Sequence, residues 1–295
     1  MKRFAPSLLT LFAGLPVQAA DWTAHPEWQR YFDDKGVRGT FVLFESATNR
    51  YSVLDEARAR ERFIPASTFK IPNALIGLEV GSIKDEKEVF RWDGKPKTRK
   101  EWERDQTLDS GMHDSVVWMF QEVARRTGKT QMKDWLERFD YGNKDISGGI
   151  DYFWLQGALR ISAVEQVDFL RKLEEGRWPV SQRSRQLVRD AIVFESTRDY
   201  VIRAKTGTSG YTRDAVGWWV GWVEKKGRPV AYFAMNYTPN TKTAYEDRFA
   251  ISKAILREAG VIDDPGKGHA VKKLEIASYS TGRKPSTERY RSPVS

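Results

Sequence analysis

Segments with the pattern of β-strands lie near both ends of this 295-residue chain, and this arrangement constrains the fold more than any other feature. The stretches 39–46 and 50–55 are rich in aromatic and β-branched residues and are separated by a short turn, so they predict a β-hairpin. Three more such stretches, 200–207, 215–224 and 228–238, lie far along the chain. A sheet that contains all five must be assembled from both ends of the chain.

The middle of the chain has the spacing of amphipathic helices. Apolar residues recur every three or four positions in 115–128, 130–142 and 162–176, and again in 242–260 after the last strand. A glycine ends each segment, as is common at helix C-termini, and the third opens with a Ser-x-x-Glu capping box. These patterns predict one α+β domain: an antiparallel sheet covered by helices, with a helical lobe of about 66–195 inserted between its halves.

The two termini differ from the body. Residues 1–20 carry two early cations, a short apolar run and small residues at the end, which is typical of a secretory signal peptide cleaved near Ala19 or Ala20. The apolar run is too short to cross a bilayer, and a buried N-terminal helix is the less favoured alternative. We therefore expect a protein of the bacterial periplasm with no remaining membrane span, one domain over 21–264 and a poorly ordered tail over 265–295.

The charge and cysteine content narrow the function. The formal net charge is +9, but the tail alone holds seven cations and two anions, so the body is nearly balanced. Nucleic-acid binding is therefore disfavoured, although an anionic partner for the tail stays open. The chain has no cysteine, which excludes cysteine nucleophiles, thiolate metal sites and disulfides. Its three histidines lie far apart, which disfavours a histidine-rich metal site and a Ser-His-Asp triad, although spacing alone does not exclude His113.

The segment "RFIPASTFKIPNALIGLE" (62–79) places Lys70 three residues after Ser67 in an apolar run. On a helix this spacing lets the amine reach the hydroxyl, and burial lowers the pKa of a lysine until its neutral form can take a proton from serine. The spacing alone is common, and the alternative without a catalytic role is a lysine whose amine extends to solvent. Pro72 interrupts helical hydrogen bonding, so we expect an irregular or 3₁₀ first turn.

Three further motifs follow in order. Ser115-x-Val117 lies at a predicted helix start, where Ser115 alone reads as an N-cap. Tyr-Gly-Asn at 141–143 ends the next helix, and Lys205-Thr206-Gly207-Thr208 (205–208) ends a strand. A cation and a hydroxyl at that strand end can hold a substrate carboxylate, and Gly207 permits close approach of a ligand to the backbone. The order Ser-x-x-Lys, Ser-x-Val, Tyr-Gly-Asn, Lys-Thr-Gly is specific to the penicillin-recognising serine acyltransferases.

Residues 38–262 resemble a class D (oxacillinase-type) β-lactamase along the whole domain. The stretches that carry the resemblance are "PASTFKIPNALIGLE", "DSVVW", "FDYGNKDISGGIDYFWLQGALRISAVEQ" and "GWWVGWVE". The resemblance implies the β-lactamase-like fold and hydrolysis of β-lactam antibiotics through a covalent acyl-enzyme. It also implies β-lactams as the small-molecule partners; a homodimer stays open.

The resemblance also implies a role for each matching residue. Ser67 corresponds to the acylated nucleophile and Lys70 to the general base, N-carboxylated by CO2 without any other cofactor. Trp154 corresponds to the residue that hydrogen-bonds this carbamate, although a lone tryptophan is more often a core residue. Ser115 corresponds to the proton relay to the leaving lactam nitrogen.

The remaining roles concern the substrate. Val117 and Leu155 correspond to an apolar lid over the carboxylated lysine. The carboxylate-binding residues correspond to Lys205, Thr206 and Arg248. The oxyanion hole corresponds to the backbone N–H groups of Ser67 and Thr208.

The sequence departs from the family pattern at Thr208, where many relatives carry an aromatic or another bulky residue, and in the loop 208–217. Both departures bear on substrate preference more than on mechanism. A β-lactam sensor of the same fold, acylated but not turned over, is the alternative function. A D,D-peptidase is a further alternative, and both are disfavoured because relatives of those kinds are tied to a membrane.

Overall fold

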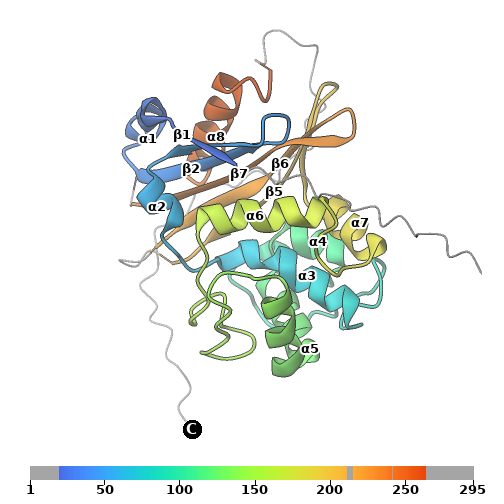
Figure 1. The fold of residues 1–295 in the computed structure, drawn as a ribbon. Coiled ribbons are helices and arrows are strands. Elements are labelled where there is room, and N and C mark those ends of the chain that lie inside the picture. Colours follow the sequence, from blue (N-terminus) through green and yellow to red (C-terminus); the bar gives the residue numbers. More distant parts are fainter. Residues whose placement is uncertain (1–19, 211–214, 241, 264–295) are drawn as a thin grey trace, which may run out of the picture.

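The computed structural model describes residues 20–210, 215–240 and 242–263, and these form a seven-stranded sheet and a helical lobe packed against one of its faces (Figure 1). The strand order is β1-β3-β2-β7-β6-β5-β4. All neighbouring strands are antiparallel except β1 and β3, which pair in parallel. The predicted fold class is confirmed, with this one parallel pair at the sheet edge.

The strands come from both ends of the chain, as the patterns predict. Their bounds are β1 Asp21–Ala24, β2 Arg38–Glu45, β3 Arg50–Leu54, β4 Val193–Ser196, β5 Val201–Thr208, β6 Gly217–Lys225 and β7 Arg228–Thr238. The strands β1 and β4 were not predicted. Each has four residues at an edge of the sheet, and none of these residues is buried, so there is no apolar alternation to detect.

The sheet is buried on both faces, and β6 shows why its sequence "GWWVGWVEK" is so apolar. Trp218 and Trp222 belong to the core shared with the helical lobe. Trp219 and Val223, on the opposite face, pack in a second core under α8 (Asp247–Glu258) and α1 (Gln29–Asp33). A strand covered on both sides loses the polar alternation of a half-exposed strand.

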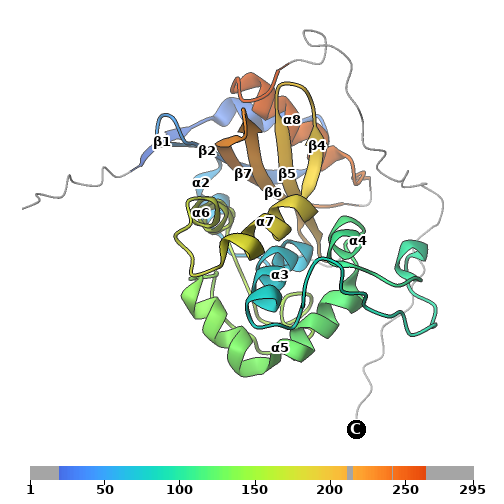
Figure 2. The same ribbon diagram turned by 90° about the vertical axis from the view of Figure 1, so that its right-hand side faces the viewer.

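The lobe is built from helices between β3 and β4, and Figure 2 shows α3 lying between α5 and α7 on the side of the sheet away from α8. The α-helices here are α2 Glu56–Arg60, α3 Lys70–Glu79, α4 Leu108–His113, α5 Val117–Arg138, α6 Ala163–Glu174 and α7 Gln182–Ala191. Single 3₁₀ turns are η1 Pro26–Trp28, η2 Ala66–Phe69 and η3 Lys100–Trp102.

Several helix predictions are confirmed, and others differ in their bounds. The Ser162–Glu165 capping box of α6 is present. The predicted division at Gly128 is also confirmed: α5 consists of two helical segments that meet at a kink where Gly128 leaves helical geometry with φ 76°. Helix α8 begins at Asp247, five positions later than predicted, because the Asp247 side chain accepts the N–H of Ala244. Such local side-chain bonds favour turns over helix.

The predicted signal peptide and the predicted C-terminal tail lie outside the described residues, apart from Ala20 at the boundary. In the part of the chain that the structure describes, no helix combines the length and apolar character needed to cross a bilayer.

Candidate active site

Ser67 lies in the 3₁₀ turn Ala66–Phe69, directly before α3 begins at Lys70. A 3₁₀ turn precedes α3, but the expectation of an irregular or 3₁₀ turn at Pro72 itself is wrong. Pro72 is the third residue of the α-helix Lys70–Glu79, where a missing N–H has no partner within the helix and costs least. Ala66 adopts φ 50° and donates its N–H to the carbonyl of Trp154 at 3.0 Å. Its neighbours therefore hold the turn in a left-handed conformation that alanine rarely adopts.

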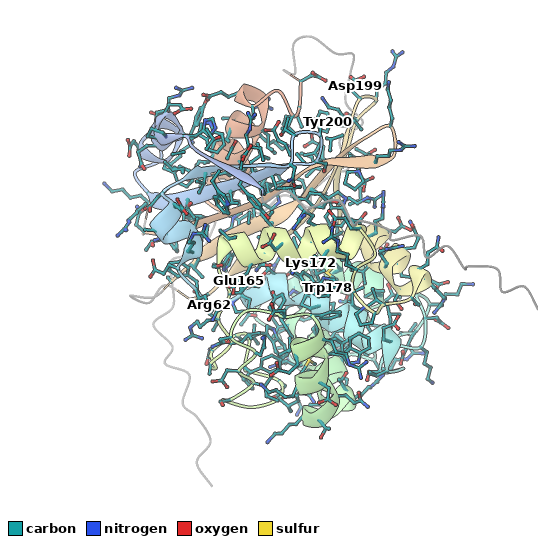
Figure 3. All side chains as sticks on the ribbon, in the orientation of Figure 1. Arg62, Glu165, Lys172, Trp178, Asp199 and Tyr200 are labelled. Atoms are coloured by element: carbon teal, nitrogen blue, oxygen red, sulfur yellow. The ribbon has the colours of Figure 1, made fainter. Side chains whose placement is uncertain are left out.

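The segment before this turn is fastened to α6. The backbones of Phe63 and Ile161 exchange two hydrogen bonds. Arg62 Nε lies 3.0 Å from both carboxylate oxygens of Glu165, and Figure 3 shows these two side chains next to each other at the start of α6. These contacts fix the chain just before the turn that holds Ser67.

Lys70 and Ser67 form the pair that the spacing predicts, with 2.7 Å between Nζ and Oγ. Lys70 is completely buried, and its Nζ lies 5.6 Å from the centre of the Phe120 ring. Burial holds the pKa of the Lys70 amine well below its ordinary value, and the positive charges of Lys205 and Arg99 lower it further. A neutral amine at this distance is able to accept the hydroxyl proton of Ser67.

A second lysine–serine pair joins α4, α5 and β5: Lys205 Nζ lies 3.0 Å from Ser115 Oγ. The interpretation of Ser115 as a helix N-cap is wrong, since Val116 is the N-cap of α5 and Ser115 has φ 56°. This backbone conformation frees the hydroxyl for Lys205. Burial lowers the pKa of Lys205 to about 7, with smaller contributions from Arg248 and Arg99.

Gly207 lets β5 lie against the nucleophile turn. A Cβ atom added at Gly207 would lie 2.9 Å from the Pro65 carbonyl oxygen and 3.2 Å from the Thr68 nitrogen. We predicted that Gly207 allows a ligand to approach the backbone closely. In the structure, its missing side chain allows the backbone of the nucleophile turn to approach β5. Together with the effect of Lys205 on the Lys70 pKa, this places both lysine–serine pairs in one site.

Thr206 and Arg248 complete the cationic side of the site. The Thr206 hydroxyl accepts from Tyr245 Oη at 3.0 Å and lies 3.4 Å from Lys205 Nζ. Arg248 is 2% exposed, and all its five N–H groups are used: Nε, both Nη1 and both Nη2 hydrogens donate to protein acceptors. One of these acceptors is the Thr208 hydroxyl, at 3.1 Å.

Trp154 contacts the nucleophile turn, and Val117 and Leu155 are the two residues predicted to form a lid. Trp154 is fully buried and stacks on Phe69 with ring centres 5.3 Å apart. Its Nε1–H has no hydrogen-bond acceptor among the described residues. Val117, the first residue of α5, and Leu155 are each partly exposed.

Arg99 is a site residue that the sequence did not reveal, because "KPKTRKEWERD" reads as a solvated charged run. It lines a cavity of about 130 Å³ together with Lys205, Thr206 and Tyr245. Its charge lowers the pKa of both Lys70 and Lys205.

His113 lines the same cavity. Its Nδ1 lies 2.9 Å from Asp114 Oδ1, so this ring pairs with the aspartate rather than with Ser67 or Ser115. In the described ranges, no group of three or more His, Asp or Glu side chains could hold a metal.

Comparison with known proteins agrees with this geometry. A family model described as the penicillin binding protein transpeptidase domain matches residues 39–259. The chain is 44% identical to β-lactamase OXA-5 of Pseudomonas aeruginosa over 265 residues, which cover 89% of this chain and 99% of that protein. It is 43% identical to β-lactamase OXA-48 of Klebsiella pneumoniae, with 86% and 96% covered.

A solved class D β-lactamase from Nostoc, YbXI, superimposes with a TM-score of 0.77 at 32% identity, over 80% of this chain and 99% of that one. The fold and the family model define a protein of the penicillin-binding transpeptidase type. Within that type, the chain belongs to the class D serine β-lactamases, a class of hydrolases. The resemblance predicted from the motifs is confirmed.

Proposed function

We propose that the protein hydrolyses β-lactam antibiotics through an ester formed on Ser67. The observation that carries this proposal is the buried Lys70 amine, 2.7 Å from Ser67 Oγ and with a depressed pKa. The relatives in the comparison are named β-lactamases, which supports the same substrate class here.

Acylation begins when Ser67 Oγ attacks the lactam carbonyl carbon and its proton passes to Lys70 Nζ. The carbonyl oxygen gains negative charge, and we assign the backbone N–H groups of Ser67 and Thr208 to stabilise it. As the C–N bond of the lactam breaks, Ser115 Oγ donates its proton to the departing nitrogen. Lys205, 3.0 Å from Ser115, returns a proton to that oxygen.

After acylation, Lys70 releases to solvent the proton that it took from Ser67, and Lys205 regains a proton from solvent. Water then attacks the ester carbonyl, and its proton is taken at the Lys70 position. The bond between the carbonyl carbon and Ser67 Oγ breaks, and the proton returns to Ser67. Because the same side chain serves both half-reactions, the ester does not accumulate if Lys70 is neutral.

We further propose that Lys70 is N-carboxylated by CO2, since CO2 reacts only with a neutral amine. The surroundings fit this modification: Lys70 is in an apolar pocket, and the buried Trp154 Nε1–H has no acceptor among the described residues. When present, the carbamate supplies an anionic base that can accept that hydrogen bond. Val117 and Leu155 are proposed to shield this position from bulk water.

The substrate carboxylate is proposed to bind at Lys205 and Thr206, beside Arg248. Lys205 and Arg248 are both buried, and each is a cation held at one end of β5 by hydrogen bonds. An anionic ligand offsets the cost of keeping these charges out of water. We also propose that residues 1–20 direct export to the periplasm.

Hydrolysis of a chromogenic cephalosporin tests the proposal. Wild-type protein is expected to turn over the drug repeatedly, and Ser67→Ala is expected to abolish the reaction. Mass spectrometry of drug-treated wild type separates an enzyme from a sensor: a transient adduct supports hydrolysis, whereas a permanent adduct identifies a receptor.

A further inference from the structure

Arg248 has no spare hydrogen bond to give. Its Nε donates to the Tyr245 carbonyl at 2.9 Å, and its Nη1 to the carbonyls of Gly207 and Trp218 at 3.0 and 3.1 Å. Its Nη2 donates to Tyr237 Oη at 2.9 Å and Thr208 Oγ1 at 3.1 Å. A substrate carboxylate therefore reaches this guanidinium only by replacing one of these five acceptors.

The five acceptors differ in how readily they can leave. Three are backbone carbonyls, two of which belong to paired residues of β5 and β6. The fourth, the hydroxyl of Tyr237, is buried in the core under α8. Thr208 is exposed at the end of β5, so its hydroxyl can move away by a rotation about χ1 that disturbs no strand pairing.

We propose that the Thr208 hydroxyl is a specificity-determining group that occupies the Arg248 position a substrate carboxylate must take. In the free enzyme it satisfies a buried N–H and covers Nη2. On binding, one carboxylate oxygen replaces it, and a neutral hydrogen-bond acceptor is exchanged for a charged one. This inference rests on the proposed β-lactamase function and adds a competitor for the carboxylate within the site.

The exchange has a predictable effect on affinity. A substrate bound by wild type gains the bond to Arg248 but loses the bond between Thr208 and Arg248. In Thr208→Ala only the gain remains, because the guanidinium N–H is left without its protein acceptor in the free enzyme. Only the lost side-chain bond separates the two proteins, since the backbone N–H of residue 208 is present in both.

The test compares KM for benzylpenicillin with KM for its methyl ester, which lacks the anionic carboxylate. For Thr208→Ala we expect KM for the acid to fall about fivefold, which corresponds to roughly 1 kcal/mol. KM for the ester is expected to change less than twofold by the same reasoning, since an ester oxygen is a weaker acceptor for Arg248. Thr208→Ser keeps the hydroxyl but loses the branched rotamer restriction, so its effect on the acid is expected to be smaller.

The matched control is Thr48→Ala, an exposed threonine in the turn between β2 and β3, for which neither KM changes. If Thr208→Ala does not fold, Thr208→Val, which removes the same hydroxyl and keeps a branched side chain, decides the question by the same acid-to-ester ratio. An unchanged or higher KM for the acid in a folded variant that lacks the hydroxyl at position 208, or equal shifts for acid and ester, overturns the inference. Failure of wild type to hydrolyse either compound counts instead against the proposed function.

Discussion

Two lysine–serine pairs meet in one site, and their similarity hides different tasks. Lys70, at the start of α3, has its Nζ 2.7 Å from Ser67 Oγ. Lys205, on β5, has its Nζ 3.0 Å from Ser115 Oγ. Both amines are buried, but the pKa of Lys70 is held well below its ordinary value while that of Lys205 is about 7. The lowered pKa of Lys70 favours its neutral form, and Lys205, with a pKa of about 7, is divided between ammonium and amine at neutral pH.

The difference comes from what surrounds each amine. Lys70 lies beside Phe120 with Lys205 and Arg99 as its nearest charged influences, and both are positive. Lys205 keeps three oxygen neighbours, the hydroxyls of Ser115 and Thr206 and the Thr206 carbonyl. Oxygen acceptors stabilise an ammonium, so one fold provides a proton acceptor and an anion-binding cation from the same residue type.

Loss of the first pair is expected to have the largest effect. Ser67→Ala removes the nucleophile and Lys70→Ala removes the base, and each is expected to lower kcat by about 10⁴-fold or more. Steady-state hydrolysis of a chromogenic cephalosporin measures this. The double variant is expected to be no worse than either single variant, because the two side chains act as a unit; multiplied losses would contradict a shared step.

Loss of the second pair is expected to cost less. Ser115→Ala removes the group that we assign to protonate the leaving nitrogen, and a drop of roughly 10²- to 10³-fold in kcat is expected. Pre-steady-state kinetics should assign this loss to acylation rather than to hydrolysis of the ester. If acyl-enzyme accumulates in Ser115→Ala, the variant is slow in deacylation, and the assignment of the second pair to acylation is wrong.

The pH dependence of kcat/KM should show both pairs at once. Lys70 must be neutral, which gives a loss of activity in acid, and Lys205 must be charged to bind a carboxylate, which gives a loss above its pKa of about 7. With the methyl ester of the same drug, the alkaline loss is expected to become smaller, because only the return of a proton to Ser115 still needs charged Lys205, while the acid loss remains. An alkaline loss of equal size with the ester would remove Lys205 from carboxylate binding.

Arg99 offers a smaller change that acts on both pairs together. Its positive charge lowers the pKa of Lys70 and of Lys205, so Arg99→Gln is expected to shift both limbs of the profile to higher pH, by less than about one unit. Lys100→Gln is a matched control, because Lys100 is the next residue, has a side chain 88% exposed and already pairs with Glu103. Equal shifts in the two variants would indicate a general charge effect.

The lysines also leave a signature in stability. In the folded protein the pKa of Lys205 is about 7, below its ordinary value of 10.5. Protonated Lys205 therefore destabilises the folded state, and the full destabilisation is present at or below pH 7. That penalty disappears as pH rises toward 10.5. Lys205→Met is therefore expected to raise the free energy of unfolding by on the order of 2 kcal/mol at pH 7 and by little near pH 10. Urea denaturation at the two pH values measures this difference, and a pH-independent gain would contradict it.

Much of this molecule was predictable from its sequence because long apolar patterns specify it. The five long strands, the capped helix α6 and the Ser67–Lys70 pair all follow from spacing and turn residues. The edge strands β1 and β4 were missed because their four residues carry no buried alternation. Arg99 was missed because its role depends on tertiary structure that brings it to the same cavity as Lys205 and Thr206, which no local pattern encodes.

The sequence misled at Ser115, and it did not reveal the hydrogen bonds that surround Arg248. A serine before a helix normally caps it, but here a positive φ turns the hydroxyl to another use. For Arg248, the resemblance implies a role in binding the substrate carboxylate, and the structure adds that five protein acceptors surround its guanidinium. Whether all N–H groups of a buried arginine are hydrogen-bonded depends on tertiary packing, and a sequence motif does not predict it.

The left-handed conformations of Ala66 and Ser115 have a consequence for how this protein can change over generations. Each costs about 1 kcal/mol or more for a residue with a Cβ, and the buried Lys70 adds a further cost. A selection that rewarded heat resistance alone would favour glycine at positions 66 and 115 and an apolar side chain at position 70. Such a lineage would gain a more durable protein and lose the groups that react.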